Sequence, residues 1–188
     1  RFDSRNDPML PNKGQYLEMA FEQGFGSFTF PVFTAEARQY FTVWSRPDGS
    51  GKQILTMRGF LGVAGQDTPV YERFYAGDFR SMRGFAFRGV GPYVMGSNTG
   101  GIFSVLGSVE YQFPWTANDR LHQVVFCDFG TVESDYQLND IRAAVGTGIR
   151  VTVPGLSPLP LAFDIAFPVN KTDDDRTRVF TFFIGAFW

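Results

Sequence analysis

The chain has 188 residues, enough for one domain with a core, and its 17 Lys and Arg against 19 Asp and Glu argue against a nucleic acid as partner. The single cysteine, Cys127, excludes an internal disulfide, and the single histidine, His122, makes a Cys/His metal site or a Ser-His-Asp triad hard to build. We therefore expect no enzyme activity, no metal and no cofactor.

Apolar residues alternate with polar or small ones in eight segments, which is the pattern of β-strands. In chain order the segments are residues 15–24, 33–45, 53–65, 101–114, 121–132, 141–154, 161–169 and 179–188. In the first of them Leu17 and Phe21 lie on one face, and Glu18 and Glu22 on the other. No window holds the roughly 18 uninterrupted apolar residues of a membrane helix. The sequence therefore predicts an all-β chain with one long connection, residues 66–99, between the third and fourth strands.

Each predicted strand has an apolar face and a polar face, and two architectures use that pattern. A soluble sandwich or barrel buries the apolar face, whereas a membrane barrel turns it to lipid and lines a lumen with the polar face. Short turns here alternate with longer or more acidic connections, as in bacterial outer-membrane barrels. The sequence therefore favours a transmembrane antiparallel up-and-down β-barrel in the bacterial outer membrane. The charged residues expected to face the lumen are Glu18, Glu22, Glu36, Arg38, Arg58, Glu110, Asp128, Arg142, Arg150 and Asp164.

The long connection contains the run ERFYAGDFRSMRGFAFRGVGP, residues 72–92. This run resembles the signature of the BamA/TamA superfamily of outer-membrane assembly and translocation barrels, in which an RGF-containing tetrapeptide lies in the sixth extracellular loop. DSRNDPMLPNKGQ, residues 3–15, is similar to the turn before a barrel strand in that family, and the later strands resemble its last strands in order. The terminal FTFFIGAFW resembles the family's C-terminal insertion signal, here with Phe182, Ile184 and Trp188. The resemblance covers essentially the whole chain and corresponds to the C-terminal half of the barrel.

The resemblance implies a role for the charged stretch. In the family this loop folds back into the lumen, and the matching positions here are Arg83 with Glu110 and Asp128 as its acidic partners. The alternation places both acids on the inner face, where a guanidinium fork between two carboxylates forms charge-assisted hydrogen bonds. Gly84 is expected to let the chain pass close to the wall, and Phe85 to pack beneath it. The alternative is that Arg83 is one of several solvated loop arginines.

Two further stretches carry structural expectations. NKTDDD, residues 170–175, is expected to be an exposed charged loop rather than a calcium site, because it lacks the spacing of a ligand loop. Gly146 and Gly148 are expected to leave room at the wall for bulky neighbours or for the docked loop.

Members of the family have sixteen strands and usually carry periplasmic POTRA domains, whereas residues 1–188 supply one barrel domain with eight strands and no POTRA domain. An eight-stranded barrel has a lumen that side chains fill, so the long connection would not fit inside it. Three arrangements remain: half of a longer barrel, two copies paired edge to edge, or a barrel closed on itself with the loop over its mouth. For a standalone chain we expect closure, with one seam between the strands around Leu17 and Phe182.

Two functions of different class follow. The first is a barrel that inserts or translocates client β-barrel proteins through a weak seam, with outer-membrane lipid, such clients and a POTRA-containing partner as its interactors. The second is a small structural or anchoring outer-membrane barrel that has lost this activity.

Overall fold

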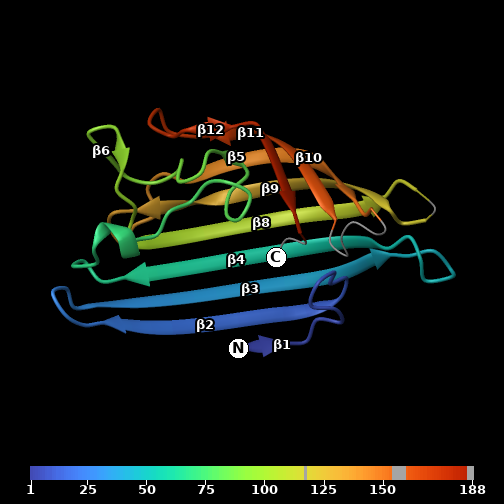
Figure 1. Cartoon of the computed structure of the whole chain (residues 1–188), viewed down its shortest axis with the longest axis horizontal. Coiled ribbons are helices and arrows are strands. Elements are labelled where there is room, and N and C mark those ends of the chain that lie inside the picture. The colour runs from blue at the N-terminus through green and yellow to red at the C-terminus, as the bar shows by residue number, and fades with distance from the viewer. Residues whose placement is uncertain (117, 154–159, 186–188) are drawn as a thin grey trace.

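The computed structural model describes residues 1–116, 118–153 and 160–185. Its main feature is one antiparallel sheet of nine strands, in the order β1-β2-β3-β4-β8-β9-β10-β11-β13 (Figure 1). Their bounds are β1 Phe2–Asp3, β2 Gly14–Gly24, β3 Phe30–Trp44, β4 Gln53–Ala64, β8 Phe103–Pro114, β9 Leu121–Glu133, β10 Arg142–Val151, β11 Leu161–Asn170 and β13 Phe180–Ile184. A strand lies in each of the eight predicted segments, but the sheet counts nine because β1 adds to its edge. None of the described helices is long and apolar enough to cross a membrane.

The long connection is itself structured. It contains the 3-10 helix η1 (Val70–Glu72) and the short strands β5 (Gly84–Phe85), β6 (Tyr93–Val94) and β7 (Ser97–Asn98). β6 pairs with β7, while β5 pairs with β12 (Thr177–Arg178) of the connection before β13. The two connections are therefore joined by a small sheet of their own.

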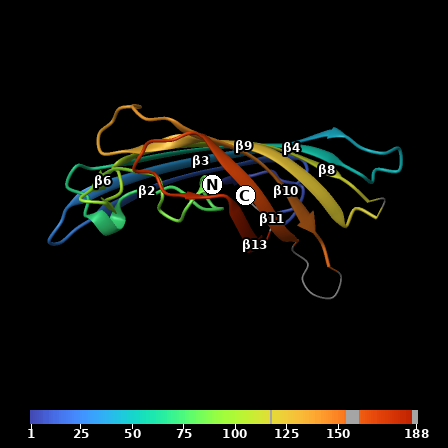
Figure 2. The ribbon, with the colours of Figure 1, turned by 90° about the horizontal axis from the view of Figure 1, so that it is seen from above.

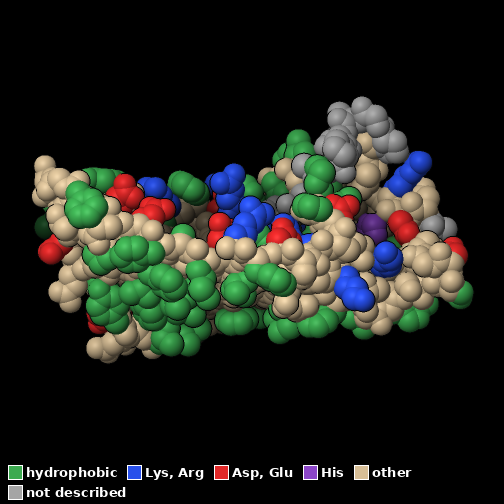
Figure 3. Space-filling view, turned by 90° about the horizontal axis from the view of Figure 1, so that it is seen from below, with side chains coloured by type: hydrophobic (Ala, Val, Ile, Leu, Met, Phe, Trp, Pro, Cys, Tyr) green, Lys and Arg blue, Asp and Glu red, His purple; other side chains and the backbone are tan. Residues whose placement is uncertain are grey.

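The burial of side chains is the reverse of that in a soluble protein. Alternate positions of the strands expose large apolar side chains, such as Met19 at 60% and Phe21 at 66%, while Asp128 and Asp164 on the other face are fully buried. Figure 2 shows a single curved layer of strands with the long connection on its inner side. Hydrophobic side chains form a band along one side of the molecule, and charged ones gather in the hollow along the other (Figure 3). An apolar outer surface of this kind suits hydrocarbon.

The core lies between the concave face of the sheet and the long connection. Buried apolar side chains of the connection pack against those of β8, β9 and β10, in a cluster formed by Ala76, Met82, Phe85, Val90, Leu106, Val132 and Ala144. The connection thus occupies the space that the wall side chains of a small closed barrel would fill.

The expectation that the chain closes on itself is wrong. β1 and β13 lie at opposite ends of the sheet, and β2 and β13 are not paired. The physical reason is the docked connection, because closing the sheet would need the concave space that the connection fills. In the described part of the chain, β2 pairs with β3 along its inner edge, but its outer edge beyond Leu17 has no strand partner, and neither has the outer edge of β13.

Candidate functional site

The candidate site is centred on a tight turn, residues 77–85, that approaches the concave face. The amides of Ser81 and Met82 donate to the carbonyl of Asp78 at 3.2 and 3.0 Å, and the amide of Asp78 donates to the carbonyl of Phe85 at 3.0 Å. The Ser81 hydroxyl closes the turn by donating to the carbonyl of Gly77 at 3.0 Å. These bonds bring Arg83 to the end of the turn, facing the strands.

Gly84 makes the close approach of the turn to the wall possible. It has a φ of +89°, a conformation that residues with a side chain rarely adopt. A Cβ at this position would lie 3.0 Å from Cβ of Ala144 on β10 and 3.4 Å from Cβ of Ala166 on β11. The next side chain, Phe85, is fully buried in the core. Glycine followed by a large apolar residue therefore brings the backbone against the wall and then anchors it.

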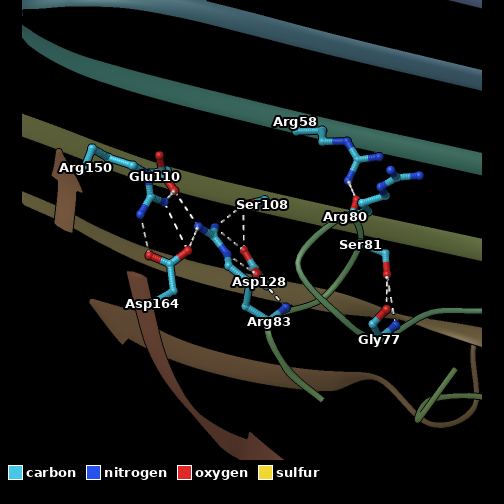
Figure 4. A network of polar contacts seen from close by, with 10 residues as sticks. All are labelled: Arg58, Gly77, Arg80, Ser81, Arg83, Ser108, Glu110, Asp128, Arg150 and Asp164. Carbon is cyan, nitrogen blue, oxygen red and sulfur yellow. Dashed lines mark hydrogen bonds and ion pairs between the residues drawn. The ribbon is translucent and has the colours of Figure 1, made fainter. Parts of the chain in front are cut away.

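Arg83 is buried, at 1% exposure, and its guanidinium is bound by acids of two neighbouring strands (Figure 4). Nε and Nη2 donate to the two carboxylate oxygens of Asp128 on β9, both at 2.8 Å, and the backbone amide of Arg83 donates to the same carboxylate at 2.9 Å. Nη1 donates to Oε2 of Glu110 on β8 at 2.5 Å. The structure thus brings Arg83, Glu110 and Asp128 together, with a bidentate contact that a lysine could not form.

Arg150 and Asp164 extend this arrangement into one network. Arg150 on β10 donates to both oxygens of Asp164 on β11, at 2.5 and 3.1 Å, and its Nη2 lies 3.5 Å from Oε2 of Glu110. Nη1 of Arg83 lies 3.5 Å from Oδ2 of Asp164. Two guanidinium groups therefore alternate with three carboxylates, so each buried charge has an opposite charge beside it. The alternation of the sequence placed Arg150 and Asp164 on the inner face but did not link them to Arg83.

Two glycines of β10 leave room for the network. The Arg83 guanidinium carbon lies 3.4 Å from the centroid of the Phe126 ring on β9, a cation–π contact. A Cβ at Gly146 would lie 2.4 Å from that ring, and one at Gly148 would lie 1.8 Å from Oδ1 of Asp164. Small residues at these positions thus leave room for bulky and charged neighbours, as expected from the sequence.

A third buried arginine, Arg142, holds the connection before β13. Arg142 at the start of β10 donates to Oδ2 of Asp175 at 3.1 Å and to the Thr131 hydroxyl on β9 at 2.9 Å. The same Asp175 oxygen accepts from the amide of Thr172 at 2.7 Å. The expectation that residues 170–175 form a wholly exposed loop is therefore wrong for Asp175, which is 7% exposed because it pairs with Arg142.

The two connections meet next to this ion pair. The amide of Ala86 donates to the carbonyl of Arg176 at 2.8 Å, and the amide of Arg176 donates to the carbonyl of Gly89 at 3.0 Å. These backbone bonds continue the pairing of β5 with β12. Sequence reasoning missed this junction, because two-residue strands have no pattern to recognise.

Two of the three residues expected to form the C-terminal insertion signal, Phe182 and Ile184, lie on the other face of the sheet. Phe182 and Ile184 of β13 are exposed, at 48% and 61%, and the Phe182 ring centroid lies 4.9 Å from that of Phe163 on β11. They do not contact the Arg83 network. Trp188 lies outside the described residues.

The arrangement binds a loop, since the side chains of the network hold Arg83 of the long connection. Over residues 1–116, 118–153 and 160–185, no group of three or more His, Cys, Asp or Glu side chains is placed to hold a metal ion. The carboxylates of the network face arginines instead.

An inside-out antiparallel sheet with a charged loop held on its concave face has the architecture of an outer-membrane β-barrel wall. The chain belongs to the Omp85 superfamily, whose domain matches residues 1–188. It corresponds to a C-terminal barrel portion of BamA-type members of this superfamily.

Two curated relatives carry the name "Outer membrane protein assembly factor BamA". The protein of Neisseria meningitidis serogroup B is 28% identical over 169 residues, covering 70% of this chain and 21% of that protein. The protein of Nitratidesulfovibrio vulgaris is 27% identical over 128 residues, covering 65% and 16%. The crystal structure of BamA from Haemophilus ducreyi lacking POTRA domains 1-3 shares the fold, with a TM-score of 0.80 and 21% identity over 96% of this chain and 40% of that chain. The chain thus spans about a fifth of these curated relatives.

Proposed function

We propose that the chain is part of the wall of an integral outer-membrane β-barrel that inserts or translocates client β-barrel proteins. The observation that carries the proposal is the burial of Arg83 between Glu110 and Asp128, which holds the long connection on the concave face. The names of the two relatives, outer membrane protein assembly factors, support the same function. The exposed apolar side chains of the outer face support a place in the lipid.

The open edges of the sheet support a larger wall around this chain. Unpaired backbone groups are not tolerated in hydrocarbon, so the edges of β2 and β13 need partners there. We infer that further strands of a longer barrel supply them, since the chain spans only part of each relative. An edge-to-edge pair of two copies is the other arrangement that satisfies both edges. The mass of the particle in detergent distinguishes the two.

The proposed mechanism is templating by backbone hydrogen bonds, without covalent chemistry. An edge strand at a seam pairs with a client strand through its N–H and C=O groups, as in β-augmentation. The buried Arg83 network fixes the curvature of the wall beside that seam, because it ties β8, β9, β10 and β11 to one loop. In this proposal a POTRA-containing segment or partner delivers the client.

The test is the folding of a client barrel in liposomes that contain the intact protein. We expect the wild-type protein to speed client folding over empty liposomes and Arg83→Ala to lose most of that acceleration. Arg88→Ala is the matched control, because Arg88 is an exposed arginine of the same connection. If the wild-type protein folds and inserts normally but does not accelerate the client, the alternative of a structural or anchoring barrel is correct.

A further inference from the structure

The last strand of the sheet is held by few contacts. β13 has five residues and pairs with β11 on one side only, and its other edge has no strand partner among the described residues. Of its side chains, Thr181 and Phe183 are buried on the concave side, while Phe180, Phe182 and Ile184 are exposed. Contacts made by Phe183 therefore contribute strongly to keeping this strand in the sheet.

Phe183 stacks on a ring of the long connection. The ring centroids of Phe79 and Phe183 are 5.3 Å apart, with an interplanar angle of 16°. Phe79 belongs to the same tight turn that carries Arg83. The docked turn thus contacts the last strand directly, 104 positions further along the chain.

A cation flanks each of the two rings. The Arg80 guanidinium carbon lies 5.4 Å from the centroid of Phe79, and that of Arg150 lies 5.3 Å from the centroid of Phe183. These four residues, Arg80, Phe79, Phe183 and Arg150, are called the ring column below. Such contacts add to the stacking of the two rings.

Both ends of the ring column are fixed to the wall. Arg150 belongs to the network of Arg83, through Glu110 and Asp164. At the other end, Nη1 of Arg58 on β4 donates to the backbone carbonyl of Arg80 at 2.9 Å (Figure 4). The ring column therefore crosses the concave side from β4 to β13, and it is complete only while the turn is docked.

We propose that Phe79 is a positioning residue that couples the docking of the long connection to the retention of β13 in the sheet. While Arg83 is bound, Phe79 holds Phe183 and with it the last strand. When the turn leaves the wall, β13 loses this support and separates more readily from β11. The edges of β11 and β13 that pair with each other then become available to another strand. This inference deepens the proposed function, since β13 borders the seam at which a client would pair.

The test is hydrogen exchange of the β13 amides, Phe180–Ile184, in the intact protein in lipid nanodiscs. Loss of one aromatic stacking contact predicts that Phe79→Ala raises the exchange rate of these amides roughly threefold to tenfold. Phe79→Tyr, which keeps a ring, is expected to stay within about twofold of the wild type. Phe87→Ala is the matched control, because Phe87 is an exposed phenylalanine of the same connection, at 65%. It is also expected to leave β13 unchanged.

A second pair of variants tests the coupling itself. We expect Arg83→Ala to raise β13 exchange as well, and Phe79→Ala to add nothing further in the Arg83→Ala background. Hydrogen exchange of the β9 amides reports whether the fold is retained. Phe183→Leu removes the ring from the strand instead of from the turn, and we expect it to raise β13 exchange as much as Phe79→Ala does. The inference is overturned if β13 exchange in Phe79→Ala and Phe183→Leu equals the wild type, or if it rises equally in all strands. Because the readout needs no client, it decides this inference even if the protein assembles nothing.

Discussion

Removing the Arg83 guanidinium tests the docking of the long connection most directly. Arg83→Ala deletes the side-chain hydrogen bonds to Asp128, Glu110 and Ser108, and it keeps the backbone bond to Asp128. Asp128 is fully buried, so the variant leaves a buried carboxylate without its cation.

The free-energy cost of Arg83→Ala depends on which of the three carboxylates keep a partner. Breaking a buried ion pair by removing one member costs about 3 to 5 kcal/mol. Asp164 and Glu110 retain Arg150, at 2.5 and 3.5 Å, and Asp128 retains the Ser108 hydroxyl at 2.6 Å. We therefore expect Arg83→Ala to cost about 3 kcal/mol, at the low end of that range. This cost corresponds to roughly a hundredfold rise in the equilibrium constant for opening of the turn.

The assay is hydrogen exchange of the Ala86 and Val90 amides, which donate to Arg176 and Ala76 in the docked state. In the intact protein, Arg83→Ala is expected to raise the exchange of these two amides about a hundredfold, whereas Arg88→Ala, at an exposed arginine of the same connection, leaves it near the wild-type rate. Asp128→Asn in the Arg83→Ala background removes the unpaired charge, so we expect it to lower the exchange rate of these amides roughly tenfold relative to Arg83→Ala alone. If Ala86 exchanges at the wild-type rate in Arg83→Ala while β9 stays protected, the network does not hold the loop.

Three further predictions concern the wall and the second connection. Arg142→Gln leaves Asp175 without its cation and loosens the connection that contains β12. Because β12 pairs with β5, hydrogen exchange of residues 84–89 should rise although Arg142 does not bond to them, and unchanged exchange would contradict this link through β12. Gly148→Ala places a Cβ 1.8 Å from Asp164 and should lower the free energy of unfolding in urea by about 1 to 3 kcal/mol, whereas Gly59→Ala, with open space around it, should not. Val145→Arg puts a charge on the exposed apolar face and should make the free energy of folding into lipid bilayers less favourable by about 2 to 4 kcal/mol. The measurement is a urea titration in which the folded fraction is read from heat-modifiable mobility on a gel.

The long strands were predictable because each has one consistently apolar face. In β2, for example, the alternation around Leu17 and Phe21 predicted residues 15–24, and the strand spans Gly14–Gly24. β1 was missed because its two residues contain no alternation, and it forms only by pairing with β2. The edges of the sheet were not predictable either, since closure depends on what fills the concave side.

The candidate site was predictable only in part, for a geometric reason. Alternation tells which face a residue is on but not its level along the barrel axis. Asp164 lies opposite Gly148, and Asp128 lies opposite Ala144, so the register of β9, β10 and β11 decides which charges meet. Asp175 was missed because its burial depends on Arg142, far from it in the sequence.

The junction between the two connections is made of main-chain atoms. The bonds that join Ala86 and Gly89 to Arg176 do not involve their side chains. The neighbouring Phe87 and Arg88 are exposed, so substitutions there leave the junction intact. The outward side chains of this stretch can thus be exchanged for others without altering the main-chain junction beneath them.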